Sequence, residues 1–216
     1  MSTKVIVIAS TKGGSAKSSV ATALAVCAAS EGDKVTLVDA DPQQSAGFWW
    51  DRRGKPDNPD LVTVHSEREL ARAIGRLHAD NRDWVIVDSP PALIERVEAA
   101  IELADFVLIP ARPSMFDAEA VSPAVELCQE AGRPFAFVVT HADARWKLLS
   151  GFIDALKDFG PVLAEHMSYS DVYASAVTAG KTGPEMRGKA GSEAREEIAA
   201  LWKAVKKRVA DKRGRS

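Results

Sequence analysis

The chain has few cysteines, and it lacks any long apolar run. Cys27 and Cys128 are the only cysteines among 216 residues, and each lies in an apolar segment without metal-type spacing. A disulfide scaffold is therefore excluded, and buried thiols in a reducing compartment are expected. No segment approaches the roughly 18 apolar residues of a membrane span, and the N-terminal run is too short for a signal peptide. We therefore expect a cytoplasmic protein without a membrane partner.

An excess of charge of either sign is also missing. The 28 Lys and Arg residues nearly balance the 30 Asp and Glu residues, which gives a net charge of -2. Nucleic-acid binding would thus depend on local clustering of basic residues. With 46% hydrophobic and 27% charged residues, the composition is typical of a folded globular protein. We expect one domain over residues 1–216, with 211–216 as a frayed basic tail.

Short apolar runs rich in β-branched residues recur along the chain. They cover residues 5–9, 35–38, 84–87, 106–109 and 135–139, with a weaker run at 61–64. Continuous apolar runs are typical of parallel strands that are covered by helices on both faces. Helical spacing follows at residues 18–30, 67–77, 92–103, 118–131 and 192–210. This alternation predicts an α/β fold with a doubly wound, mainly parallel sheet and helices on both faces.

A glycine-rich loop joins the first predicted strand to the first predicted helix. Its candidate binding residues are Lys12, Gly13, Gly14, Ser15, Ala16, Lys17, Ser18 and Ser19. In such a loop backbone N–H groups converge on phosphate oxygens, and a lysine and a hydroxyl lie at the helix start. Lys17 would contact the β- and γ-phosphates, and Ser18 would bind Mg²⁺. By itself, a Gly-Gly pair would fit equally well a tight turn beside an incidental lysine.

Carboxylates follow two further predicted strands. Asp39 and Asp41 end the run at 35–38, and Asp88 ends the run at 84–87. Ligands of open parallel sheets bind beyond the carboxyl ends of the strands, where these side chains would meet the loop. A single Asp in this position is often a helix cap, but three matched strand ends favour a binding site.

These segments together resemble the ParA/MinD group of P-loop ATPases with a deviant Walker A motif, most closely the short ParA-type partition ATPases. The matching residues are 12–18, 39–43, 85–91 and 104–110. The resemblance is specific from about residue 4 to residue 139 and looser beyond. It implies the P-loop NTPase fold, ATP and Mg²⁺ as cofactors, and ATP hydrolysis.

The resemblance also implies individual roles. Lys12 resembles the signature lysine that reaches the partner's phosphates across a nucleotide-sandwich dimer, with a solvated loop lysine as the alternative. Asp41 resembles the residue that positions the attacking water, and Asp88 resembles the Walker B carboxylate. Asp39 would support the switch segment, which is the stretch at residues 39–44 around Asp41. The implied metal set is Ser18, Asp39, Asp41 and Asp88, and the implied catalytic pair is Lys12 and Asp41.

One position departs from the family pattern. The residue before the P-loop lysine, which is glycine in the family, is Ala16 here. Glycine suits such loops because a left-handed backbone costs a residue with a Cβ about 1–2 kcal/mol. Ala16 is either a tolerated variant or a change that weakens binding, dimerisation or turnover. We predict retained nucleotide binding with reduced hydrolysis.

Base recognition has weaker signals. Thr140 and Asp143 follow the run at 135–139, at the place where related proteins contact the base, and residues 167–170 would begin a helix at the same edge. His141 between them is more typical of a loop histidine. Trp49 and Trp50 follow the switch segment, where core packing is favoured over an exposed aromatic anchor.

The last predicted helix combines an apolar stripe with a basic face. The basic candidates are Lys203, Lys206, Lys207, Arg208, Lys212 and Arg213. A solvated face, a non-specific DNA surface and a membrane-surface helix are the alternatives. The resemblance favours DNA, with contacts to phosphates and no sequence readout.

The main functional expectation is DNA partition of a plasmid or chromosome. An ATP-bound homodimer would bind DNA non-specifically, and a small centromere-binding partner, ParB-like or ParG-like, would stimulate hydrolysis. The protein would then be nucleoid-associated. The alternative is a nucleotide-dependent positioning or scaffold protein for chemotaxis clusters or microcompartments, with little turnover.

Overall fold

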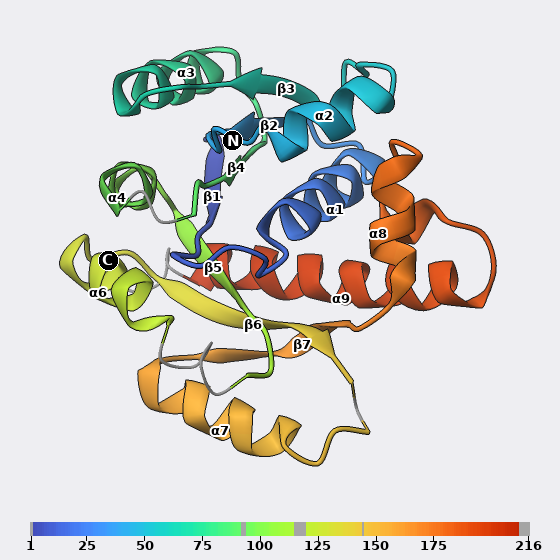
Figure 1. Cartoon of the computed structure of the whole chain (residues 1–216). Coiled ribbons are helices and arrows are strands. Elements are labelled where there is room, and N and C mark those ends of the chain that lie inside the picture. The colour runs from blue at the N-terminus through green and yellow to red at the C-terminus, as the bar shows by residue number, and fades with distance from the viewer. Residues whose placement is uncertain (1, 92–93, 115–119, 144, 212–216) are drawn as a thin grey trace.

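A single parallel sheet forms the centre of the computed structural model (Figure 1). The structure describes residues 2–91, 94–114, 120–143 and 145–211. Within these residues the strands are β1 (Lys4–Ile8), β2 (Val35–Asp39), β3 (Asp60–Thr63), β4 (Trp84–Asp88), β5 (Phe106–Ala111), β6 (Phe135–Ala142) and β7 (Val162–Ser168). Their order in the sheet is β3-β2-β4-β1-β5-β6-β7, and every pairing is parallel. The predicted doubly wound α/β fold is confirmed.

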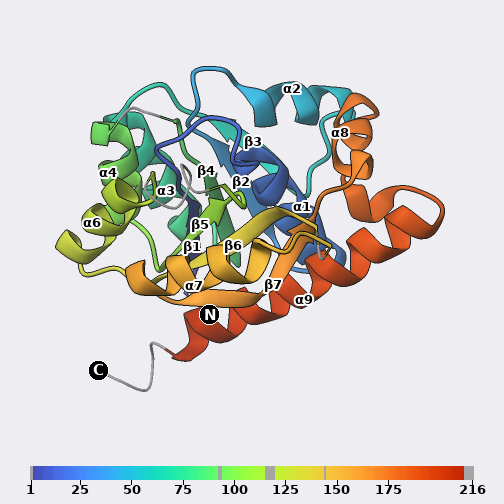
Figure 2. The same ribbon diagram turned by 60° about the horizontal axis from the view of Figure 1, so that its bottom comes forward.

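Helices cover both faces of this sheet (Figures 1 and 2). One face carries α1 (Lys17–Ser30), α2 (Ser45–Arg52), α8 (Asp171–Thr178), the short η1 (Gly183–Glu185) and α9 (Lys189–Asp211). The other face carries α3 (Glu67–Ala79), α4 (Ile94–Glu102), α6 (Ser122–Glu130) and α7 (Leu149–Phe159). Each face thus has its own hydrophobic core.

The central strands form because their side chains are apolar on both faces. In β1, Val5 and Val7 enter the core beneath α3 and α4, whereas Ile6 and Ile8 enter the core beneath α1 and α9. All four side chains are at most 1% exposed. The period of two between faces explains why the strand reads as one continuous apolar run.

The edge strand β7 and helix α8 are the main differences from the prediction. In β7 exposed and buried residues mix, so the sequence has no continuous apolar run there. Met167 and Ser168 end this strand, and α8 begins at Asp171 with Ser170 as its side-chain cap. The expectation that residues 167–170 begin a helix was therefore wrong by about one helical turn. An edge strand needs apolar residues on fewer positions, because it has one neighbour and more solvent contact.

The C-terminal helix extends slightly beyond its predicted limits. Helix α9 includes Asp211, which was predicted to belong to a frayed tail at 211–216, and the other residues of that tail, 212–216, lie outside the described residues. Trp202 is fully buried on the inner face of α9 and packs edge-on against Trp84, with ring centroids 4.7 Å apart. No helix in the described part of the chain has the length and apolar character to cross a bilayer.

Candidate functional site

The candidate site lies where β1, β2 and β4 end side by side. In the parallel register Asp88 is level with Asp39 on one side and with Ile8 on the other. The glycine-rich loop continues directly from β1. The carboxylates predicted from separate segments are therefore brought to one edge of the sheet, as expected for a ligand site in a parallel fold.

Hydrogen bonds within the loop give it a defined shape. The backbone N–H of Lys12 donates to the Ser10 hydroxyl at 3.2 Å, and Lys17 Nζ donates to the Lys12 carbonyl at 3.3 Å. Thr140, which is fully buried at the end of β6, donates to the Ser15 carbonyl at 3.2 Å. Thr140 thus anchors the loop to β6, which lies on the other side of β1 from β4.

Ala16 adopts the left-handed conformation that glycine favours. Its φ is 68° and its ψ is 25°, and it is the residue directly before α1. A Cβ in this conformation costs about 1–2 kcal/mol. The structure thus places backbone strain at the one loop position that departs from the family pattern.

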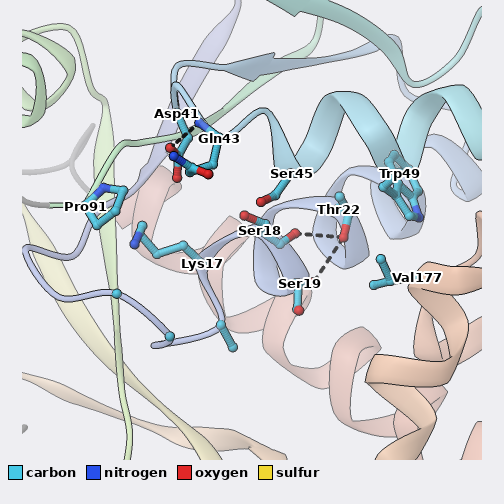
Figure 3. Close-up of a pocket in the computed structure, with 13 residues that line it drawn as sticks. Lys17, Ser18, Ser19, Thr22, Asp41, Gln43, Ser45, Trp49, Pro91 and Val177 are labelled. Atoms are coloured by element: carbon cyan, nitrogen blue, oxygen red, sulfur yellow. Dashed lines mark hydrogen bonds between the residues drawn. The ribbon is translucent and has the colours of Figure 1, made fainter.

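A cavity of about 430 Å³ opens between the loop, the switch segment and α8 (Figure 3). Its lining residues are Gly13, Gly14, Ala16, Lys17, Ser18, Ser19, Thr22, Asp41, Gln43, Ser45, Trp49, Pro91 and Val177. Lys17 and Pro91 lie at one end of the cavity, and Trp49 and Val177 lie at the other. The start of α1 points its free N–H groups to this space, which favours an anionic ligand.

The buried charges of the site favour positively charged ligands near Asp88. Burial raises the pKa of Asp88 to about 7, against the opposing effects of the Ser18 hydroxyl and the Lys17 ammonium. Neither oxygen of Asp88 has a partner with normal hydrogen-bond geometry. Burial also lowers the pKa of Lys17, which the carboxylates of Asp88 and Asp41 partly oppose.

Asp39 has a different role from Asp88. Its Oδ1 accepts a hydrogen bond from the Asp41 backbone N–H at 3.1 Å, and its Oδ2 accepts one from the Gly47 N–H at 2.8 Å. Both oxygens are therefore in use, which favours positioning of the switch segment over direct metal binding. Asp41 in turn accepts from the Gln43 N–H at 2.9 Å and faces the cavity.

These residues fit a magnesium ion that takes some of its ligands from the protein and the others from water and a nucleotide. Mg²⁺ usually keeps several waters and takes one or two protein oxygens together with substrate phosphates. The Ser18 hydroxyl, the unpartnered oxygens of Asp88 and the cavity-facing Asp41 supply such oxygens. No cluster of three or more His, Cys, Asp or Glu side chains suited to a metal is found among the described residues, so a protein-only metal cage is not indicated there.

A smaller cavity of about 250 Å³ lies beside the first and shares Ala16 and Ser19 with it. Thr140, His141, Tyr169 and Tyr173 are among its lining residues. Asp143, the other predicted base contact, does not line it.

The Asp143 carboxylate pairs with Arg145 at 2.7 Å. The hydrogen bond from the Arg145 guanidinium lowers the pKa of Asp143 to about 2. In this structure the Asp143 carboxylate is thus paired with a residue of its own loop.

The predicted DNA-binding residues lie away from this site. Lys203, Lys207 and Arg208 are exposed near the end of α9, whereas Lys212 and Arg213 lie outside the described residues. Lys206 pairs with Glu31, and its Nζ lies 5.6 Å from the centre of the Trp202 ring. Glu31 follows the end of α1 that is farthest from the loop. The basic end of α9 therefore lies near the amino ends of the strands, whereas Lys12 lies at their carboxyl ends.

Several cavity residues had no distinct signal in the sequence. Trp49 is 1% exposed and donates through Nε1 to the Lys181 carbonyl at 2.9 Å, which confirms core packing over an exposed anchor. Gln43 belongs to the matched segment 39–43, whereas Ser45 follows that segment without a signal of its own. Val177 comes from α8, whose start was predicted about one helical turn too early.

Asp39→Asn is expected to destabilise the protein by about 1–3 kcal/mol. The amide has one acceptor oxygen, so the N–H of Asp41 or Gly47 would lose its partner in a buried place. Urea denaturation checks the free energy of unfolding. The control Asp57→Asn changes an exposed carboxylate and should stay within about 0.5 kcal/mol. Equal effects of both changes would contradict the positioning role of Asp39.

Comparisons with known proteins identify the family. The model of the CobQ/CobB/MinD/ParA nucleotide binding domain matches residues 6–183. A relative from Halothiobacillus neapolitanus, "Maintenance of carboxysome distribution protein A", is 28% identical over 93% of this chain and 95% of its own length. "Protein ParA" of Rhizobium radiobacter is 33% identical over 64% of this chain and 62% of its own length.

Solved structures agree on the fold. The septum site-determining protein MinD of Pyrococcus horikoshii, in complex with Mg-ADP, superposes with a TM-score of 0.72 at 18% identity, and the match covers 92% of this chain and 95% of that one. The predicted ATP and Mg²⁺ agree with a nucleotide and metal bound to this fold. The chain belongs to the CobQ/CobB/MinD/ParA family of nucleotide-binding domains, which includes the P-loop ATPases of ParA and MinD type.

Proposed function

We propose that this chain is an ATP-switched positioning protein that distributes a protein microcompartment or a similar large cargo within the cell. The observation that carries the proposal is the nearly full-length similarity to a protein named for carboxysome distribution, together with a phosphate loop whose Lys17 and Ser18 line a cavity. This is the alternative that the sequence left beside DNA partition, and the comparisons support it better than the partition reading.

The residues of the cavity divide the work of nucleotide handling. Backbone N–H groups of Gly13 to Ser18 and the Lys17 ammonium hold the phosphates, since both carry positive potential into a partly buried space. Bound Mg²⁺ would supply charge neutralisation at the β- and γ-phosphates. Asp41 faces the phosphate end of the cavity and orients the attacking water as a hydrogen-bond acceptor. Asp39 holds Asp41 in place through the backbone.

Lys12 connects hydrolysis to assembly. It is half-buried in the loop and is not a lining residue of the cavity of its own chain. A second copy facing this edge of the sheet would receive its ammonium at the γ-phosphate, where charge develops during transfer. ATP would thus join two copies, and hydrolysis would release them.

Lys12→Ala is expected to abolish the ATP-induced dimer while nucleotide affinity stays within about threefold of the native protein. Lys17→Ala should instead lose nucleotide binding itself, because its ammonium lies inside the cavity. Light scattering after size exclusion, with ATP·Mg²⁺, ADP and no nucleotide, measures assembly, and a fluorescent ATP analogue measures binding. A Lys12→Ala protein that still dimerises with ATP would contradict the role of Lys12.

DNA partition remains the second candidate function. It is supported by the ParA relative and by exposed Lys203, Lys207 and Arg208 at the end of α9. In this reading the ATP-bound dimer binds DNA through phosphates, and a ParB-like or ParG-like partner stimulates hydrolysis. Both readings permit nucleoid association, so DNA binding alone does not separate them.

Deletion of the gene in its own host separates the two candidate functions. Loss of a positioning protein should make labelled microcompartments cluster while plasmids remain stable. Loss of a partition protein should raise the rate of plasmid loss and leave microcompartments evenly spaced. Normal spacing of every labelled microcompartment, together with plasmid loss, would overturn the positioning proposal.

Ala16→Gly is expected to raise ATP turnover about fivefold, with nucleotide affinity within twofold. This factor corresponds to about 1 kcal/mol of left-handed strain that is added between the ATP-bound state and the transition state and that glycine avoids. Steady-state hydrolysis by the purified variant measures it. The control Ala131→Gly makes the same change at a negative φ away from the site. Unchanged turnover in Ala16→Gly would remove the basis for weakened hydrolysis.

A further inference from the structure

A second large cavity, of about 470 Å³, lies on the same face of the sheet as α1 but outside the nucleotide site. It lies between the second half of α1, the segment after α2, η1 and the first half of α9. Its lining residues are Ala23, Val26, Cys27, Ala29, Ser30, Glu31, Arg53, Asn58, Pro59, Pro184, Glu185, Arg195, Ile198 and Ala199. Its volume is in the range of about 300–1,000 Å³ that is typical of ligand pockets.

The wall formed by α1 is apolar and incompletely covered. Helix α1 carries apolar residues around its whole circumference, a pattern typical of a helix buried on all sides. The sheet covers one side and α9 another, yet Val26 and Cys27 remain partly exposed in the cavity. Small side chains on both helices, such as Ala23 and Ala199, leave the space open. An apolar group that entered here would complete the burial of α1.

Both acidic side chains at the rim of the cavity are paired with basic groups of the chain. Glu185 is held by both terminal nitrogens of Arg53, at 2.7 and 2.8 Å. Glu31 accepts from Trp202 Nε1 at 3.2 Å and pairs with Lys206.

Arg195 differs from these groups. Its Nη2 donates to the Pro184 carbonyl at 2.8 Å, and it forms no ion pair within the described chain. Both acids at the rim are therefore neutralised, and the guanidinium of Arg195 offers its other N–H groups to an incoming anion.

We propose that this cavity docks a partner protein through a large apolar side chain that has a carboxylate beside it. The apolar side chain fills the space against Val26 and Cys27, and the carboxylate pairs with Arg195. Anchors of this kind dominate protein interfaces because a small desolvated pocket concentrates binding energy. A free metabolite is disfavoured, because such pockets use several convergent polar groups, whereas polar side chains of this rim such as Asn58 and Glu185 are already hydrogen-bonded within the chain.

The cavity is built from the same helices as the nucleotide site. On α1, Thr22 lines the nucleotide cavity and its neighbour Ala23 lines the second cavity. Trp49 on α2 lines the first, and Arg53, directly after α2, lines the second. Docking therefore acts on the nucleotide site through α1 and α2. This coupling rests on the proposed function, whereas the docking itself does not.

A random twelve-residue peptide library displayed on phage, selected on the full chain, tests the docking. Enriched peptides should carry a large apolar residue next to Asp or Glu. Their affinity, measured by fluorescence anisotropy, should fall at least tenfold with Ala199→Trp, which fills the cavity. The matched control Ala200→Trp alters the next exposed position of α9, which does not line the cavity, and should stay within twofold.

Charge reversal tests the carboxylate contact in the same assay. Arg195→Glu should weaken binding at least tenfold, whereas Arg72→Glu, an exposed change on α3, should stay within twofold. Absence of enrichment, enrichment of basic peptides, or equal binding to Ala199→Trp would each overturn the docking proposal.

The coupling has a separate readout. A bound peptide should change the affinity for a fluorescent ATP analogue at least twofold, and an unchanged affinity would overturn the coupling. The ATP-induced dimer is measured independently on the unmodified chain. Peptide binding without such a dimer would leave the docking in place and contradict the proposed function, so the two failures are distinguishable.

Discussion

The parallel register of β2, β4 and β1 is the constraint on which the site depends. It sets Asp88 level with both Asp39 and Ile8, so that two carboxylates and the start of the phosphate loop meet at one edge. A slip of one residue would turn each of these side chains to the opposite face of the sheet. The register is specified strongly, because both faces of β1 and β4 are buried and a slipped strand would place Asp88 in an apolar core at high cost.

The charges brought together by this register are costly to bury. Asp41 and Asp88 lie near the Lys17 ammonium, and burial opposes the charged form of Asp88 and of Lys17. Asp39 reduces its own cost by accepting two backbone hydrogen bonds, whereas Asp88 has no such compensation. A cation bound with an anionic phosphate group would satisfy both sides of this arrangement, which makes nucleotide and Mg²⁺ complementary to the site as a pair.

The sequence predicted best where the physical signal is local and repeated. The buried strands read as apolar runs because both faces are covered, and the loop before α1 needs particular residues at fixed spacing. Strand β7 escaped prediction because an edge strand mixes exposed and buried positions. Asp143 was assigned to the base from its place after β6, but its neighbour Arg145 competes for the carboxylate. The cavity against α1 had no signal at all, because it arises from small residues on helices far apart in the sequence.

Helix α2 is held by hydrogen bonds at both ends. These contacts set the free energy that is needed to move the helix. At its start Gly47 donates to Asp39 at 2.8 Å, and after its end Arg53 donates to Gly180 and pairs with Glu185. Trp49 between them donates to Lys181. Each partly buried contact of this kind contributes on the order of 1–3 kcal/mol. A ligand shifts the equilibrium between two positions of α2 only by the difference between its binding free energies to those two positions. Nucleotide beside Asp41, before the start of α2, and a partner in the cavity that Arg53 lines, after its end, would act on the two ends of this helix, so each should alter the affinity for the other by the same factor.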